Sequence, residues 1–370
     1  MGHLHRAKRL IEGFNQLGME VDVIYGGMPV EIEFAARSVF HLPPVRAKDA
    51  SYKSYLDGEG NPLGSQWLEQ RKDLLINYVH DRHFDMLLLE AYPFGRRVVR
   101  DEIQALIAEA EKRNPRPLIV SSVRDILQEK RKPGRNEETR DLVLKHFDHV
   151  LVHADPSIID LADTFPLAHE IRDKLAYTGF VVPQAAGSEP TESFDILCTA
   201  GGGGFGFKLL QTAIETACTS PWDTKKWCLA TGPHMTPEES NYLRDKAPPN
   251  VTLVELLPNL VGHMKKAELS ISQCGYNTAM DVLAAHESSQ CRAVFVPYDI
   301  EGQTEQLRRA QLLSSKGFAI NVPQSELTPE TLSKALIDAA KLERVDHQSQ
   351  FDGIAKSARI VRNWLLHRSL

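Results

Sequence analysis

The chain has 370 residues, 42% of them hydrophobic, and a formal net charge of −6. This length favours two domains of roughly 100–200 residues each, and the composition is that of a globular protein. The negative charge argues against a nucleic-acid partner, since nucleic-acid-binding proteins carry a basic field. No apolar run reaches the ~18 residues of a membrane span. The five cysteines form no C-x-x-C pair and indicate reduced thiols in the cytoplasm.

Helix-like and strand-like patterns alternate through the first half of the chain. Strands that alternate with helices predict a parallel sheet covered on both faces. The predicted elements are helices over 4–17 and 102–112, strands over 21–25, 85–89, 118–120 and 149–152, and a long loop over 42–64.

The first half lacks one element that a doubly wound domain needs. The sequence opens with Met1-Gly2-His3-Leu4-His5-Arg6, a turn that leads into a helix, where a central strand should come first. We infer that Met1 is an internal methionine of a longer chain; a fold that starts with a helix is the alternative. A missing strand predicts a gap or an unpaired edge in the first sheet, with Gly2 and His3 beside it.

Residues 183–193 are typical of an interdomain linker, and the alternation restarts at Phe194. The expected fold is therefore α/β, with two doubly wound halves and a cleft between them. In such sheets, ligands bind at the carboxyl ends of the strands.

A glycine cluster opens the second half. Residues 198–206 read Cys-Thr-Ala-Gly-Gly-Gly-Gly-Phe-Gly and follow an apolar run. A strand that enters such a cluster and then opens a helix makes a phosphate cradle, because glycine lets the backbone approach the anion closely. A tight turn is the alternative, since the run is not a clean dinucleotide fingerprint.

Three further polar segments follow predicted strands of the second half. Asn277 and Thr278 open a helix, where they can cap it or help to hold phosphate. Asp281 lies about one turn later, within reach of a ribose. The carboxylate of Glu305 beside the amide of Gln306 suits adjacent sugar hydroxyls. A helix cap is the alternative for each segment alone, but their combination favours a nucleotide-sugar site. The segments are 231–233, 270–281 and 301–306.

Together these segments resemble the donor-binding domain of GT-B glycosyltransferases of family 28, the MurG-like group. The resemblance covers roughly residues 194–320. It departs from the family at Gln273, where these enzymes have a basic residue. The donor-binding residues that it implies are Gly201, Gly202, Gly203, Gly204, Leu257, Ser272, Gly275, Asn277, Thr278, Asp281, Glu305 and Gln306.

The resemblance also implies a role for each segment. The backbone of Leu257 would meet the nucleotide base, and residues 275–278 would hold the diphosphate. Asp281 would bind the ribose, while Glu305 and Gln306 would bind the donor sugar. It further implies an acceptor-side domain over 1–183, a donor domain over 184–350, and a helix over 351–370 that returns to the first domain.

The first half agrees more weakly with this family. Residues 2–6 are similar to the Gly-His first turn of these enzymes and to the Gly-His-x-x-Arg turn of a related nucleotide-sugar hydrolase with a catalytic histidine. Residues 91–97 and 123–127 resemble bacterial predicted glycosyltransferases of unknown acceptor. Inverting transfer needs a general base. The candidates are His3, Glu90 and Asp125, with capping or salt-bridged side chains as the alternative.

The expected function is transfer of a sugar from a nucleoside-diphosphate sugar, most simply a UDP-sugar, with inversion. No metal or cofactor is expected, because backbone dipoles can stabilise the leaving diphosphate. The acceptor is unidentified; a lipid-linked molecule or a polysaccharide precursor is expected. A hydrolase or epimerase acting on the same donor, and a non-catalytic binding module, are the alternatives.

Two basic segments predict a peripheral contact with anionic lipid or with a phosphorylated acceptor. They are residues 130–135 and the polar face of the first helix, with Arg6, Lys8 and Arg9. A solvated surface is the alternative for both.

Overall fold

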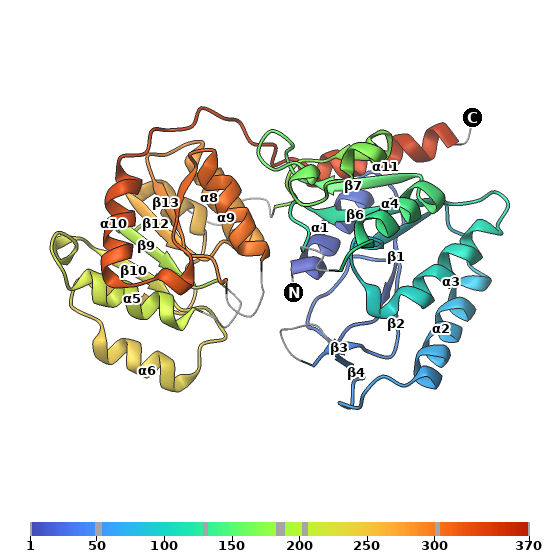
Figure 1. Ribbon diagram of the computed structural model, residues 1–370, viewed down its shortest axis with the longest axis horizontal. Helices are drawn as coiled ribbons and strands as arrows, with labels where there is room; N and C mark the ends of the chain where they lie inside the picture. Colours follow the sequence, from blue (N-terminus) through green and yellow to red (C-terminus); the bar gives the residue numbers. More distant parts are fainter. Residues whose placement is uncertain are drawn as a thin grey trace. The chain divides into compact units, whose positions relative to one another are not determined.

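The computed structural model describes residues 2–48, 54–128, 132–182, 189–201, 206–299 and 304–368. The chain forms two compact units, Met1–Val182 with Gln350–Leu370 and Pro183–Ser349. Both units combine parallel strands with helices (Figure 1), which confirms the predicted α/β class. No helix among the described residues is long and apolar enough to cross a membrane.

The described parallel strands of the first unit form two separate sheets. β1 pairs with β2, and a second sheet has the order β5-β6-β7-β8. β1 and β5 share no ladder in the described part of the chain, so the predicted gap is present. The strands are β1 (Asp22–Tyr25), β2 (Ser38–His41), β5 (Met86–Glu90), β6 (Leu118–Arg124), β7 (His149–His153) and β8 (Leu175–Tyr177).

Helices and a small antiparallel pair complete the first unit. The pair, β3 (Arg46–Ala47) with β4 (Tyr55–Leu56), lies inside the segment predicted to be a loop. The helices are α1 (Gly2–Gln16), α2 (Ser65–His80), α3 (Arg100–Glu111), α4 (Arg135–His146) and α11 (Gly353–Arg368), with short 3-10 turns at Arg97–Val99, Leu161–Asp163 and Ala168–Lys174.

The last helix, α11, packs on the first, α1 (Figure 1). Ala358 and Val361 of α11 join Leu10 and Phe14 of α1 in one buried apolar cluster. Trp364 lies on the rim of that cluster, where its ring stacks on His149 at 3.9 Å and an angle of 7°. The first unit is therefore built from two distant parts of the sequence.

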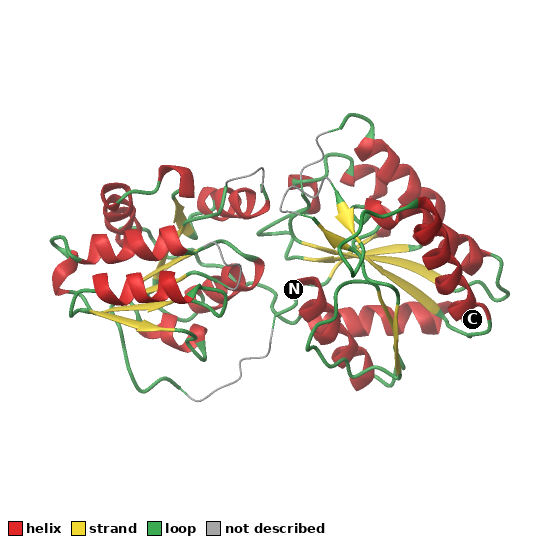
Figure 2. Cartoon of the chain, turned by 90° about the horizontal axis from the view of Figure 1, so that it is seen from below, coloured by secondary structure: helices red, strands yellow, loops and turns green. Residues whose placement is uncertain are grey.

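The second unit holds one six-stranded parallel sheet with the order β11-β10-β9-β12-β13-β14. Helices cover both of its faces (Figure 2). The chain order reverses between β9 and β12, and ligands bind at such a switch point. The strands are β9 (Ile196–Thr199), β10 (Trp227–Ala230), β11 (Val251–Val254), β12 (Leu269–Ser272), β13 (Arg292–Phe295) and β14 (Ala319–Asn321).

The core of the second unit lies between this sheet and its helices. Ile196, Ile271 and Val294 are fully buried on neighbouring strands, as is typical of a sheet covered on both faces. The helices are α5 (Phe207–Ala217), α6 (Pro237–Lys246), α7 (Leu260–Lys266), α8 (Tyr276–His286), α9 (Glu305–Ser315) and α10 (Pro329–Ala340), with 3-10 turns at Trp222–Thr224 and Gln324–Glu326.

Candidate functional site

The carboxyl ends of β9 and β12 lie side by side in the second unit. The two strands pair in register, with Thr199 opposite Ser272. Gly201 follows β9 with a φ of +67°, and a Cβ placed on Gly232 after β10 would lie 2.5 Å from the carbonyl oxygen of Gly201. The two loops therefore pack backbone against backbone at the carboxyl ends of β9 and β10, next to the switch point. Gly202, Gly203 and Gly204 lie outside the described residues.

The N-terminus of α8 lies directly after β12. Gly275 is its N-cap and provides no side-chain cap, and a Cβ built there would meet open space. The first N–H groups of a helix lack intrahelical partners and attract anions. Asn277 and Thr278 lie in this first turn, and Asp281 lies one turn later with its side chain partly exposed. The predicted diphosphate and ribose residues thus share one helix start.

Arg309 connects the start of α9 to the turn before α8. Its guanidinium is fully buried and donates to the carboxylate of Glu305 and to the carbonyl oxygen of Cys274, both at 2.9 Å. The side-chain oxygen of Gln306 accepts from the backbone N–H of Tyr298 at 3.2 Å. Sequence reasoning missed Arg309, although a cation four residues after a glutamate is a recognisable helical pair.

The remaining predicted donor residues differ in exposure. The hydroxyls of Ser272 and of Thr199 beside it are buried, and neither has a hydrogen-bond partner among the residues that the structure describes. Leu257 is half-buried in the loop after β11, next to Leu256, which is 64% exposed. The backbone of this loop therefore lies near the surface, as contact with a base would require.

His3 and Glu90 form a pair in the first unit. The Nδ1 atom of His3 lies 2.9 Å from Oε1 of Glu90, and their side chains are 30% and 26% exposed. Arg6 is almost fully buried and also binds Oε1 of Glu90. The structure thus combines two separately predicted candidates in one cluster at the end of β5. It also corrects the expectation that Arg6 lies on the exposed polar face of the first helix with Lys8 and Arg9, because Arg6 is 3% exposed.

The charges of this cluster determine its protonation. Burial disfavours the charged form of Glu90, but the Arg6 guanidinium and then His3 outweigh it and hold the pKa of Glu90 well below its usual range. Burial lowers the pKa of His3 by more than the bond to Glu90 raises it, and Arg124 and Arg6 lower it further. At neutral pH, His3 is therefore neutral beside an ionised carboxylate.

The ionised Glu90 favours one tautomer of His3. A carboxylate without a proton only accepts hydrogen bonds. Nδ1 of His3 has two polar neighbours, Oε1 of Glu90 at 2.9 Å and the Arg6 guanidinium at 3.1 Å. The nearer, ionised carboxylate favours donation through Nδ1–H, which leaves the lone pair of Nε2 available as a base. Asp125, the third predicted candidate, lies just after β6 and is fully buried. Its carboxylate is not at the surface where an acceptor hydroxyl could reach it.

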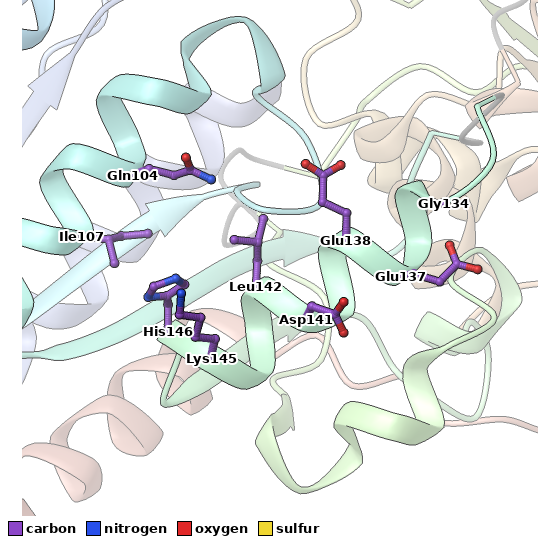
Figure 3. A pocket seen from close by; sticks show the side chains of 9 residues that line it. All are labelled: Gln104, Ile107, Gly134, Glu137, Glu138, Asp141, Leu142, Lys145 and His146. Atoms are coloured by element: carbon purple, nitrogen blue, oxygen red, sulfur yellow. The ribbon is translucent and has the colours of Figure 1, made fainter.

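A pocket of about 580 Å³ lies between α3 and α4 (Figure 3). None of the predicted catalytic or donor residues lines it. Glu138 on its wall pairs with Arg97 at 2.8 Å, and His146 pairs with Glu111 at 2.8 Å. Glu138 and His146 thus already have protein partners, and no predicted residue role falls in this pocket.

A smaller pocket of about 180 Å³ lies at the carboxyl ends of β1 and β2. Tyr25 and His41, the last residues of these strands, meet edge to face. The lining is mostly apolar: Tyr25, Val30, Ile32, Glu33, Phe34, Val39 and His41.

Comparisons with known proteins agree with this geometry. Residues 197–357 match the glycosyltransferase family 28 C-terminal domain. The chain is 24% identical over 195 residues to UDP-N-acetylglucosamine--N-acetylmuramyl-(pentapeptide) pyrophosphoryl-undecaprenol N-acetylglucosamine transferase of Gloeothece citriformis. This alignment covers 50% of this chain and 52% of that protein. The same enzyme of Nitrosospira multiformis is 31% identical over 108 residues, 29% of each chain.

Solved structures share the fold over nearly the whole chain. The calicheamicin glycosyltransferase CalG4 superposes with a TM-score of 0.65 at 14% identity, covering 98% of this chain and 95% of that one. MurG of Acinetobacter baumannii superposes with a TM-score of 0.62 at 16% identity, covering 98% and 96%. Residues 197–357 thus resemble the family 28 donor domain, and the chain has the GT-B fold. The predicted resemblance to the MurG-like group and the predicted fold are thereby confirmed.

The family match covers the second unit and the start of α11. The chain aligns with about half or less of the length of the curated relatives it matches, from 29% to 55%. The first unit, which contains the His3–Glu90 pair, lies outside this family match and is similar to the solved structures in its fold. Gln273, the position at which the sequence departs from the resemblance, is buried beside Gly201 in the second unit.

Proposed function

We propose that this glycosyltransferase moves a sugar from a nucleoside-diphosphate sugar to an acceptor hydroxyl, with inversion and without a metal ion. The observation that carries the proposal is the bridge made by Arg309. It joins Glu305 to the turn that precedes the uncapped N-terminus of α8. A sugar-binding carboxylate and a diphosphate-binding helix start are thus connected at one switch point, as a sugar nucleotide requires.

The donor would lie along the ends of the strands of the second unit. The backbone of Leu257 would bind the base, and Asp281 would bind the ribose hydroxyls. The N–H groups at the start of α8 would stabilise the charge that develops on the leaving diphosphate. Glu305 and Gln306 would bind the sugar. The names of the relatives specify a UDP-sugar, so UDP-N-acetylglucosamine is the first donor to test.

His3 would act as the general base. Its Nε2 would take the proton of the acceptor hydroxyl as that oxygen attacks the anomeric carbon and the bond to the diphosphate breaks. The imidazolium that forms would be stabilised by Glu90 at Nδ1. A lowered pKa keeps His3 unprotonated and ready to accept this proton near pH 7.

The acceptor would carry an apolar part. The pocket at the ends of β1 and β2 supports this, because its lining is mostly apolar and aromatic. The relatives' names include pyrophosphoryl-undecaprenol, which is a lipid-linked acceptor. We therefore propose a lipid-linked acceptor reached by peripheral contact with a membrane surface.

Calorimetry and a UDP-release assay test this function together. The wild-type chain should bind UDP and UDP-N-acetylglucosamine, and it should release UDP when the lipid-linked acceptor named for the relatives is added. The variant His3→Gln should bind both nucleotides as tightly as the wild type and lose turnover by about 10²–10⁴-fold. Failure of the wild type to bind any nucleoside diphosphate would contradict the proposal.

A hydrolase is the second candidate, favoured by the placement of Arg6 with His3 on Glu90 in a Gly-His-x-x-Arg turn. In that reaction water, rather than an acceptor, would attack the anomeric carbon. The same assay separates the two functions. Free sugar released at full rate without any acceptor would identify the hydrolase, whereas UDP release that depends on the acceptor identifies the transferase.

A further inference from the structure

A chain of buried polar groups extends from Glu90 into the sheet of the first unit. Ser122 on β6 donates to Oε2 of Glu90 at 2.9 Å, and its hydroxyl lies 3.0 Å from Nε2 of His153 on β7. Nδ1 of His153 lies 2.9 Å from the hydroxyl of Thr178, just after β8. Ser122, His153 and Thr178 are all fully buried. The proposed reaction does not use any of these three residues.

In this series of polar groups, His153 and Ser122 each donate a hydrogen bond in the direction of Glu90. The carboxylate is ionised, so the hydroxyl hydrogen of Ser122 points to it. His153 must then donate through Nε2–H to the oxygen of Ser122. Its Nδ1 faces the hydroxyl of Thr178, which also donates to the carbonyl oxygen of Gly179 at 2.8 Å. His153 is neutral because burial, together with the Arg6 charge, lowers the pKa of His153 to about 3. Ser122 and His153 therefore hold one defined arrangement at Oε2.

Arg6 competes with His3 for the same carboxylate. Arginine prefers to bind a carboxylate through two parallel hydrogen bonds, one to each oxygen. In this structure the Arg6 guanidinium binds Oε1 of Glu90 and lies 3.1 Å from Nδ1 of His3, while its own Nε is buried without a hydrogen-bond partner in the described part of the chain. A rotated Glu90 could offer a second oxygen to Arg6, and His3 would then lose its acceptor. The bond from Ser122 to Oε2 prevents that rotation.

We propose that Ser122 and His153 are positioning residues that keep Glu90 oriented toward His3 and prevent a two-oxygen pair between Glu90 and Arg6. The catalytic part of this inference rests on the proposed function, because the proposed function assigns His3 as the general base. The charged and titratable groups that face this cluster are Arg6 on α1, Arg124 on β6 and His153 on β7, besides His3 and Glu90 themselves.

The tautomer of His3 tests the inference without any substrate. Two-bond ¹H–¹⁵N correlation spectra of the histidine-labelled full chain distinguish Nδ1–H from Nε2–H. We expect the Nδ1–H form in the wild type and a majority of the Nε2–H form in Ser122→Ala. Ser121→Ala is the matched control. Ser121 is equally buried on the same strand, but its hydroxyl donates to the carbonyl oxygen of Tyr92 at 2.7 Å.

A double variant tests the competition with Arg6 directly. If Ser122 acts by keeping Glu90 away from Arg6, then Arg6→Met should restore the Nδ1–H form in the Ser122→Ala background. An unchanged tautomer in Ser122→Ala, or the same change in Ser121→Ala, would overturn the inference. Should Ser122→Ala fail to fold, the nearly isosteric variant Thr178→Val removes the hydroxyl at the other end of this hydrogen-bonded series. The same change of the His3 tautomer is expected.

Turnover provides the second measurement. Ser122→Ala should lower kcat roughly tenfold, the value of about one lost hydrogen bond, with the KM for the donor unchanged. Ser121→Ala should stay within about twofold of the wild type. If the wild type transfers no sugar, the proposed function fails while the tautomer result still stands. If His3→Gln loses turnover but Ser122→Ala leaves both the tautomer and kcat unchanged, only this inference fails.

Discussion

The buried guanidinium of Arg309 donates to the carbonyl oxygen of Cys274 at 2.9 Å. The same side chain holds Glu305 at the start of α9. One cation therefore fixes two backbone segments, the turn that leads into α8 and the first turn of α9. A planar guanidinium with several fixed donors can serve both partners at once, which a lysine ammonium on a flexible stem does poorly.

Arg309→Lys should weaken the binding of both UDP and UDP-N-acetylglucosamine by roughly 1–3 kcal/mol, because the turn before α8 loses its anchor. Calorimetric titration of each ligand measures the effect. Arg308→Lys is the matched control, since Arg308 is the exposed neighbour on the same helix. Equal binding by the Arg309 and Arg308 variants would show that the bridge does not shape the donor site.

Asp281→Ala should weaken UDP binding by roughly 1–3 kcal/mol, since the ribose hydroxyls would lose their acceptor. Asp281→Asn keeps one acceptor oxygen and should lose less. The measurement is the Kd for UDP, with the free energy of unfolding determined in parallel to exclude a folding defect. If the alanine variant binds UDP with an unchanged Kd, Asp281 does not bind the ribose.

Glu305→Ala should leave the Kd for UDP nearly unchanged and raise the Kd for UDP-N-acetylglucosamine. The reason is that Glu305 is proposed to contact only the sugar, while its partner Arg309 keeps its bond to Cys274. Comparing both ligands in one calorimetric series distinguishes this variant from Arg309→Lys, which should affect both. Equal losses for the two ligands would contradict the assigned role.

Acid should destabilise the first unit through His153. Its pKa is about 3 in the folded chain because of burial and the Arg6 charge, against about 6.5 when unfolded. Between these values only the unfolded chain binds the proton. Stability is therefore complete above pH 6.5 and falls as the pH drops toward 3, by up to about 1.4 kcal/mol per pH unit.

Amide hydrogen exchange of β6 and β7, corrected for its intrinsic pH dependence, measures this loss in the first unit. His153→Gln should show a shallower decrease of opening free energy between pH 6.5 and 5 than the wild type. Other histidines with lowered pKa contribute in both proteins and cancel in the comparison. The same slope in both proteins would mean that His153 does not titrate as described.

Local patterns in the sequence predicted the strands and turns that position the donor site. The strand that ends at Ser272, the glycine turn at Gly275 and the helix start at Asn277 are each set by residues within one or two turns of each other. Such signals do not depend on which strands become neighbours. The family resemblance then added the residue roles, which still stand as predictions.

The polar network of the first unit could not be predicted in the same way. The apolar pattern placed the end of a strand at Val120, whereas β6 continues to Arg124 through Ser121 and Ser122. Two serines interrupt a hydrophobic run, and their hydroxyls are satisfied by Tyr92, Glu90 and His153, about 30 residues away in sequence. His3 and Glu90 were separate candidates for the same reason, since 87 residues separate them.

The packing of α11 on α1 determines the order in which the two units can mature during synthesis. Residues leave the ribosome at about 5–20 per second, in sequence order. Every residue of the second unit therefore emerges before Ala358 and Val361, which complete the core around Leu10 and Phe14. The second unit can fold to completion while the first still exposes the apolar face of α1. Although its strands are made first, the first unit is the last to become native.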